Sequence, residues 1–104
     1  MAMAFMKLCS LSKLPPGELR EVIAGAIPIA LCNVDGEIRA IGGICPHLGG
    51  PMGYGALNGE NVVCPWHAWE FSSLTGALDF NPDIRVPTYA VRVEGDDILV
   101  DPSA

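Results

Sequence analysis

Residues 45–67 read CPHLGGPMGYGALNGENVVCPWH, with a cysteine and a histidine at each end of the stretch. In both end clusters, CPH at 45–47 and CPWH at 64–67, a proline directly follows the cysteine. Glycine is concentrated in the same region, since seven of the twelve glycines lie between Gly42 and Gly59. Thiols and imidazoles at such close spacing are typical of metal sites. The stretch therefore predicts a metal centre around which the rest of the chain folds.

Two metal centres fit a set of two cysteines and two histidines. One is a tetrahedral zinc ion, and the other is a [2Fe–2S] cluster with thiolates on one iron and imidazoles on the other. Cys45 and His47 have one residue between them, which is tighter than the roughly two to four residues usual for zinc ligands. We therefore expect Cys45 and Cys64 on one iron and His47 and His67 on the other. A zinc site, or four residues with accidental spacing, is the weaker alternative.

The ligand pattern resembles the Rieske iron–sulfur motif, which has Cys-x-His, about sixteen residues, and then Cys-x-x-His. The wider runs, CPHLGG at 45–50 and CPWH at 64–67, also look like that family. The resemblance implies one [2Fe–2S] cluster held by Cys45, His47, Cys64 and His67. It extends over nearly the whole chain, although only the two ligand loops are specific.

Glycines near the ligands have a physical use in such a site. Sulfide and thiolate sulfurs accept hydrogen bonds from backbone N–H groups, and these bonds help to set the reduction potential. Glycine lets the backbone approach that closely and reach a positive φ. We expect this role for Gly42, Gly43, Gly49, Gly50, Gly53 and Gly55.

Two features of high-potential Rieske proteins are missing from this chain. Those relatives join the two loops by a disulfide, at positions that correspond to Gly50 and Trp66 here. They also carry Ser and Tyr hydroxyls where this chain has Trp69 and Phe71. Fewer hydrogen-bond donors stabilise the reduced cluster less, so the potential should lie near about −150 mV rather than about +300 mV. In this respect the chain resembles the soluble ferredoxins that serve aromatic-ring-hydroxylating dioxygenases.

Two tryptophans flank His67, and the sequence predicts different roles for them. We expect Trp66 to form a hydrophobic collar that shields the cluster and meets a partner protein, with Pro46 and Leu48 as further docking residues. Trp69 is expected to pack in the core. Aromatic side chains serve both purposes, because each combines a large apolar surface with a polar atom.

Composition limits the classes of partner. The chain has 104 residues, enough for one domain with a modest core, and half of them are hydrophobic. Its formal net charge is −6, which argues against nucleic acid and anionic membranes and favours a partner with a basic patch. A negative surface that only maintains solubility is an equally good explanation of the charge.

The remaining cysteines and the N-terminus indicate a cytoplasmic protein. Cys9 and Cys32 lie in apolar, strand-like surroundings, where a free cysteine behaves as a small hydrophobic residue. A disulfide between them is the weaker alternative. Residues 1–6 are apolar, but they lack the basic start and the long apolar run of a signal peptide, and no stretch is long enough to span a membrane. We also expect a monomer.

Short strands separated by turn residues predict an all-β fold, and no segment has a helical period of ten residues. The expected strands are 7–10, 19–24, 28–34, 37–41, 56–57, 61–63, 77–80, 89–94 and 98–100. Residues 69–71 lead away from the second ligand loop, and residues 81–87 are expected to form a loop. The fold implied by the resemblance is one Rieske domain over residues 1–104. It would consist of an antiparallel β-barrel or sandwich base, residues 1–42 and 73–104, with an inserted cluster-binding lobe, residues 43–72.

These features together predict an electron carrier rather than an enzyme, because 104 residues leave no room for a second, catalytic domain. The carrier would take one electron at a time from a flavin-dependent reductase and pass it to a terminal oxygenase such as an aromatic-ring dioxygenase. One alternative is the small Rieske-like subunit of an assimilatory nitrite reductase. A zinc-binding structural module is an alternative of another class.

Overall fold

The computed structural model describes residues 4–46, 49–66 and 68–103. Strands and two short 3₁₀ helices make up its regular structure, and no α-helix occurs among the described residues. The elements are β1 (Met6–Ser10), η1 (Leu11–Lys13), β2 (Leu19–Ala24), β3 (Ile27–Val34), β4 (Glu37–Gly42), η2 (Met52–Tyr54), β5 (Ala56–Asn58), β6 (Asn61–Val63), β7 (Glu70–Ser72), β8 (Ala77–Leu78), β9 (Asn81–Arg85), β10 (Thr88–Glu94) and β11 (Asp97–Asp101).

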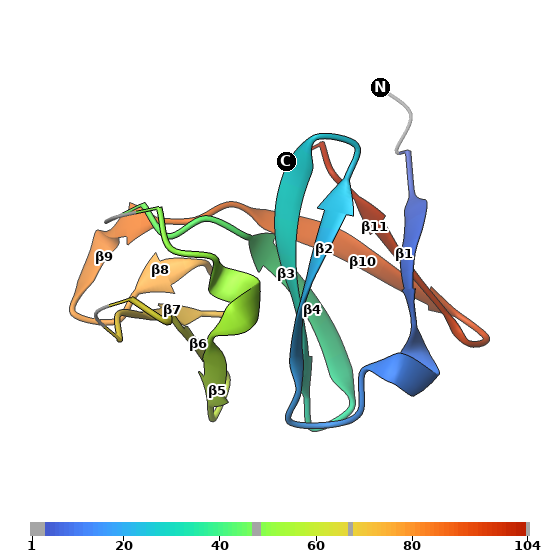
Figure 1. The fold of residues 1–104 in the computed structure, drawn as a ribbon, viewed down its shortest axis with the longest axis horizontal. Helices are drawn as coiled ribbons and strands as arrows, with labels where there is room; N and C mark the ends of the chain where they lie inside the picture. Colours follow the sequence, from blue (N-terminus) through green and yellow to red (C-terminus); the bar gives the residue numbers. More distant parts are fainter. Residues whose placement is uncertain (1–3, 47–48, 67, 104) are drawn as a thin grey trace.

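The larger sheet is antiparallel and has the strand order β1-β11-β10-β4-β3-β2 (Figure 1). Its two edge strands, β1 and β2, also contact each other, so the sheet curls into a nearly closed barrel. The β3–β4 hairpin turns at Asp35 and Gly36, which both have a positive φ. This backbone is the one that an Asp-Gly pair favours in a two-residue hairpin turn. The expected all-β base is therefore confirmed.

A second sheet lies beside this barrel, with the strand order β5-β6-β7-β8-β9 (Figure 1). Its β5–β6 hairpin pairs Asn58 with Asn61 and turns at Gly59 and Glu60. The sheet begins at Ala56 and continues through β9 to Arg85. The division into a base of residues 1–42 and 73–104 and a lobe of residues 43–72 stays a prediction. One observation bears on its second boundary: β8 pairs with β7, and β9 pairs with β8.

Residues 81–87 differ from the expected loop, because Asn81–Arg85 form strand β9. This strand lies at the edge of the smaller sheet and pairs with β8 in an irregular register. Of its side chains, only that of Ile84 is half-buried. An edge strand with one covered residue shows no alternation of apolar and polar residues, and Pro82 is tolerated there because an edge needs hydrogen bonds on one side only.

Strand β3 is buried on both faces, as its continuous apolar run predicts. Ile29 and Leu31 face the core inside the barrel, together with residues of β4 and β11. Ala30 and Cys32 face the other way and pack in a second core. That second core also contains Cys45, Met52, Val62, Cys64, Phe71, Leu78 and Val86. The strand therefore forms the shared wall between the barrel and the smaller sheet.

Arg39 makes a polar link between the two sheets. Its guanidinium leaves β4, donates a hydrogen bond from Nη1 to Ser73 Oγ at 3.0 Å, and lies 3.5 Å from Glu60 Oε1. Nη2 donates to Glu37 Oε2 at 2.7 Å. The side chain is 16% exposed, and Ser73 is buried. Since Glu60 and Ser73 belong to the turns of the smaller sheet, Arg39 helps to fix that sheet against the base.

Replacement of Arg39 by Met should lower the free energy of unfolding by about 1–3 kcal/mol, because a buried hydroxyl loses a charged hydrogen-bond partner. Urea denaturation followed by circular dichroism would measure the change. Arg85→Met is a matched control, since Arg85 is exposed and its guanidinium donates to the Pro82 carbonyl oxygen within its own strand. Equal midpoints for wild type and Arg39→Met would show that the link contributes nothing to stability.

Candidate metal centre

Two loops of equal length carry the candidate ligands. The first loop (residues 45–50) follows β4, and the second loop (residues 64–69) follows β6 directly. At the neck of the first loop, the Cys45 N–H donates to the Gly50 carbonyl oxygen at 2.8 Å. The same bond closes the second loop, where the Cys64 N–H donates to the Trp69 carbonyl oxygen at 2.7 Å. Each cysteine therefore occupies the first position of a closed six-residue loop.

The backbone conformation repeats within the loops as well. The fifth residue of each loop has a positive φ, 74° at Gly49 and 55° at Ala68. This region suits glycine, but it costs an alanine roughly 1–2 kcal/mol. The loop around Ala68 thus keeps an unfavourable torsion, as residues near functional sites often do. Among their described residues, the two loops share the neck hydrogen bond and the positive φ at the fifth position, although their sequences differ after the shared Cys-Pro.

The thiols of Cys45 and Cys64 are buried next to each other. Each residue is 1% exposed, and both belong to the core between the two sheets. Burial raises the pKa of the Cys64 thiol, the Trp66 N–H lowers it, and the neighbouring Cys45 thiol raises it further. A buried thiol such as that of Cys64 loses its proton when a metal ion supplies positive charge. The arrangement therefore fits a thiolate-bound metal better than a thiol nucleophile.

Gly50 makes room for one of these sulfurs. A Cβ at this position would lie 2.9 Å from Cys64 Sγ and 3.2 Å from the ring of Trp66. The backbone N–H of Trp66 in turn donates to Cys64 Sγ at 3.4 Å. The first loop thus packs directly on the sulfur of the second loop, so the two Cys-Pro segments form one site. The residues present fit a [2Fe–2S] cluster, since the two thiols are buried side by side. The backbone of Gly50 and Trp66 also lies close to Cys64 Sγ, as is usual for a cluster ligand.

Four other glycines of the region allow close packing, and their expected hydrogen bonds to sulfur stay a prediction. Cβ atoms at the positions of Gly43, Gly53 and Gly55 would meet backbone atoms of Pro28, Glu21 and Val63, and a Cβ at Gly42 would meet the side chain of Pro87. These glycines allow the loops to pack closely on the base and on each other. Gly50 is the one whose added Cβ would meet a cysteine sulfur.

The two other cysteines lie apart from this pair. Neither Cys9 nor Cys32 is in a disulfide, as the sequence analysis favoured. Cys32 is buried, and its burial raises the pKa of the thiol to about 11. Its Sγ lies 3.7 Å from the Arg39 carbonyl oxygen. Cys9 is half-buried in β1, at the edge of the barrel.

His47, Leu48 and His67 lie outside the described residues, so their predicted roles as ligands and as a docking residue stay predictions. Within residues 4–46, 49–66 and 68–103, no group of three or more metal-binding side chains comes together. The two thiols are the part of the predicted ligand set that the structure places.

An exposed apolar rim surrounds the buried thiols. Pro46 and Pro65 are exposed, and Trp66 is 48% exposed, as expected of a residue that meets a partner. Trp69 is half-buried against the core, with its ring 5.2 Å from Phe80 in an edge-to-face contact, which confirms its predicted packing. Ile44 is 53% exposed directly before Cys45. The sequence analysis missed Ile44, although its place between Gly43 and a ligand was the available signal.

Among the described residues, no helix has the length and apolar character needed to cross a lipid bilayer. Residues 4–90 match the protein family described as Rieske [2Fe-2S] domain. The chain is 38% identical over 100 residues to the ferredoxin component of biphenyl 2,3-dioxygenase from Rhodococcus jostii (strain RHA1), a match that covers 95% of this chain and 94% of that protein.

Solved structures of similar proteins agree with this match. One is the ferredoxin in a complex of reduced oxygenase and oxidised ferredoxin of carbazole 1,9a-dioxygenase, with a TM-score of 0.85 and 27% identity over 96% of this chain and 94% of that one. Another is a putative NADH-dependent nitrite reductase small subunit from Mycobacterium tuberculosis, with a TM-score of 0.90 and 26% identity over 100% of this chain and 99% of that one.

The contact between Gly50 and Cys64 generates a test of the site. Gly50→Ala should make the bound metal centre more labile, by about tenfold in the rate of metal loss to a chelator, because overpacking of this size costs about 1–3 kcal/mol. Bleaching of the visible absorption in the presence of chelator would measure that rate. Gly59→Asn is a suitable control, since Gly59 has open space around it and a positive φ that asparagine accepts. Equal rates for Gly50→Ala and wild type would mean that the loop has room to move away from the sulfur.

Proposed function

Because the chain belongs to the Rieske [2Fe–2S] domain family, we propose that it is a one-electron carrier between a flavin-dependent reductase and a terminal oxygenase of the aromatic-ring dioxygenase type. The observation that carries the proposal is a pair of buried thiols at the heads of two matching loops, in a chain that matches a dioxygenase ferredoxin component over nearly its whole length. The chain is an electron-transfer component and not itself an enzyme. We further propose the single Rieske domain over residues 1–104, with the lobe boundaries predicted above.

We assign the ligands as Cys45 and Cys64 to one iron and His47 and His67 to the other. The adjacency of the two thiols supports the first pair. The spacing of each histidine from its cysteine, within matching loops, supports the second pair. When bound, the [2Fe–2S] cluster supplies a one-electron redox couple, which agrees with the Rieske family and not with a zinc module.

The residues around the thiols have distinct tasks in this function. The closed necks of both loops hold Cys45 and Cys64 in fixed positions, so little rearrangement accompanies a change of charge at the site. Phe71 and Val62 are fully buried beside them and exclude water. Trp66 covers one sulfur and donates its backbone N–H toward it. The chain thereby isolates the redox centre from solvent on the core side and leaves its outer side to the partner.

We propose a reduction potential toward the low end of the Rieske range. Gly50 and Trp66 stand where high-potential relatives have a disulfide, and the ideal Cβ of Gly50 lies within 3.2 Å of the Trp66 ring, so the two positions are neighbours. Neither carries a thiol. Trp69 and Phe71 occupy the positions of the usual hydroxyl donors, and the Phe71 ring offers no O–H to a sulfur. A site with fewer donors favours the reduced, more negative state less.

Partners should dock on the rim around the thiols, with Pro46, Leu48 and Trp66 as contact residues and Ile44 beside them. Pro46, Trp66 and Ile44 are exposed, and a small apolar patch suits a brief encounter better than a permanent complex. The similar carbazole dioxygenase ferredoxin is found in a complex with its oxygenase. The net charge of −6 would attract a basic partner surface and would disfavour nucleic acid and membranes. We also propose a monomer in the cytoplasm, where the unpaired Cys9 and Cys32 would stay reduced.

The purified protein should contain two irons and two acid-labile sulfides per chain and give an EPR signal when reduced. Cys45→Ser and Cys64→Ser should lose most of this iron, because each removes a thiolate from a buried site. Cys9→Ser should keep the full cluster content and visible spectrum. Elemental analysis and EPR would measure these quantities. One zinc without sulfide, or loss of the cluster in Cys9→Ser, would contradict the ligand assignment.

Electron transfer to a partner tests the carrier function itself. With NADH, a dioxygenase reductase and the matching terminal oxygenase, the protein should be reduced and then reoxidised over many turnovers, and product formation should stop when it is left out. Trp66→Ser should slow the transfer step, while Val93→Ser, which changes an exposed apolar residue of β10 outside the rim, should not. Stopped-flow absorption would follow both steps. If neither component exchanges electrons with the cluster-loaded protein, the dioxygenase role is wrong.

A nitrite reductase small subunit is the second candidate, because a putative protein of that class has a TM-score of 0.90 over the full chain. The two functions differ in the lifetime of the complex. A subunit should copurify with a large catalytic subunit, whereas a dioxygenase ferredoxin should separate from its partners on gel filtration.

A further inference from the structure

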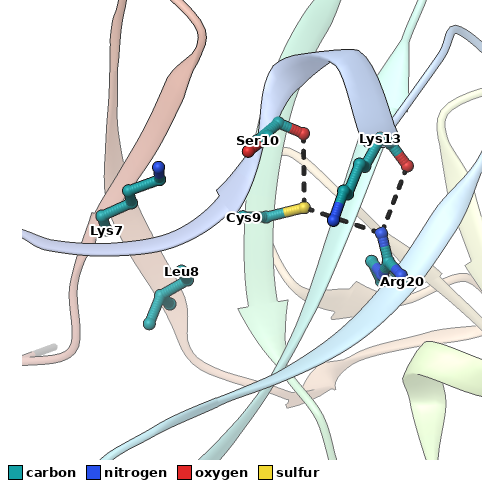
Figure 2. Close-up of a pocket in the computed structure, with 6 residues that line it drawn as sticks. All are labelled: Lys7, Leu8, Cys9, Ser10, Lys13 and Arg20. Carbon is teal, nitrogen blue, oxygen red and sulfur yellow. Dashed lines mark hydrogen bonds between the residues drawn. The ribbon is translucent and has the colours of Figure 1, made fainter.

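We propose that a cationic pocket on the barrel, away from the two thiols, binds a small organic dianion such as a dicarboxylate or a phosphomonoester. The pocket has a volume of about 390 Å³ and is lined by Lys7, Leu8, Cys9, Ser10, Lys13 and Arg20 (Figure 2). It lies where β1 and β2, the two edge strands of the barrel, come together beside η1. In Figure 1, η1 lies at the opposite end of the molecule from the smaller sheet. An occupant of this pocket would therefore leave the rim around Cys45 and Cys64 uncovered.

Positive charge is concentrated in this pocket. The chain has six Lys and Arg residues against twelve Asp and Glu, yet three of the six line one cavity. Lys7 forms an ion pair with Asp97 at 2.9 Å. In the part of the chain that the structure describes, no carboxylate forms an ion pair with Lys13 or Arg20. The pocket thus keeps two cations without an ion pair in the described part of the chain, which match the two negative charges of the proposed ligand.

The pocket also presents several hydrogen-bond donors. Arg20 Nη1 lies 3.4 Å from the Lys13 carbonyl oxygen and 4.0 Å from Cys9 Sγ, contacts that hold the guanidinium against the wall. Figure 2 shows the Cys9 side chain pointing toward Arg20, with Lys7 on the other side of Cys9. Ser10 is the N-cap residue of η1, but its hydroxyl makes no capping hydrogen bond. An arginine fork, a lysine and a free hydroxyl are suitable donors for carboxylate or phosphate oxygens.

The lining determines the class of ligand. None of the described residues in the pocket wall is aromatic, so a planar ring would find no stacking partner. Leu8 and Cys9 supply a small apolar surface beside the charges. The volume lies near the lower end of the roughly 300–1,000 Å³ that is usual for small-molecule sites. A short aliphatic compound with two negative charges fits these properties, and carboxylate and phosphate oxygens share the chemistry that the pocket recognises.

Cys9 provides a direct readout, because a ligand among these side chains would cover its half-buried thiol. The cluster-loaded, full-length protein would be alkylated with the neutral reagent iodoacetamide, and modification at Cys9 would be followed by peptide mass spectrometry. Inorganic phosphate and succinate are the probes, each titrated at constant ionic strength against KCl. We expect alkylation of Cys9 to slow saturably with at least one probe. The melting temperature should rise over the same concentration range, because ligand binding stabilises the folded state.

Two charge-matched variants separate a site from general electrostatics. Lys13→Gln removes one cation from the pocket, and Arg85→Gln removes one cation elsewhere on the surface. Lys13→Gln should raise the probe concentration for half-protection by about tenfold, the effect of losing one charge-assisted hydrogen bond. Arg85→Gln should leave it unchanged. The Lys13 side chain is exposed and forms no ion pair within the described residues, so its replacement should not disturb folding.

The two probes also distinguish the possible ligands. Protection by phosphate alone would identify a phosphomonoester site, protection by succinate alone a dicarboxylate site, and protection by both a site that reads the shared dianion. If neither anion slows alkylation more than KCl does, or if both variants weaken protection equally, the pocket is no anion site. None of these outcomes depends on electron transfer, so this experiment can fail without contradicting the proposed carrier function, and the reverse also holds.

Discussion

Two thiols on separate hairpins must lie side by side in a place that water does not reach, and much of the structure serves this requirement. Burial raises the pKa of the Cys64 thiol, so the pair is stable as thiolates only with a positive metal centre beside it. The backbone holds the geometry through the two loop necks, where Cys45 and Cys64 each donate to a carbonyl oxygen five residues later. These bonds fix each cysteine at the first position of its loop, although the residues that follow differ between the two loops. Gly50 then allows one loop to rest on the sulfur of the other.

The base keeps this pair of loops in place through one shared strand and one polar link. Because β3 is buried on both faces, its alternate side chains join the core of the barrel to the core that contains the two cysteines. Arg39, on the neighbouring strand β4, reaches turns of the smaller sheet at Glu60 and Ser73. Apolar packing sets how closely the sheets approach, while the hydrogen bond to Ser73 favours one position along the interface. The site therefore depends on residues that never touch a ligand.

The sequence predicts this architecture well where one local rule decides the outcome. The turn at Asp35 and Gly36 follows from the residues that a two-residue hairpin accepts, and the double burial of β3 follows from its unbroken apolar run. Strand β9 was not predicted, because an exposed edge strand has no buried face. Residues 81–85 therefore show no alternation of apolar and polar side chains. The glycine-rich segment predicted a close backbone approach to sulfur and a positive φ, and Gly49 has the positive φ. Gly43, Gly53 and Gly55 also permit close packing against backbone, a consequence of tertiary contacts that no local pattern encodes. The repeat of a positive φ at Gly49 and Ala68 was equally hidden, since alanine gives no signal for that conformation.

The distribution of charge assigns long-range attraction and direct contact with a partner to different parts of the surface. The smaller sheet and its loops contain two carboxylates near the thiols in sequence, and both have partners within the fold. Glu60 lies against Arg39, and Glu70 accepts hydrogen bonds from Asn58 and Asn61. The exposed rim of Ile44, Pro46, Pro65 and Trp66 is left uncharged. The net charge of −6 can then attract and orient a basic partner from a distance. Because the rim itself is uncharged, little free energy is needed to remove water from it when the partner docks. Strong charge pairs at the rim would hold a partner longer, and slow release would limit the turnover of an electron carrier.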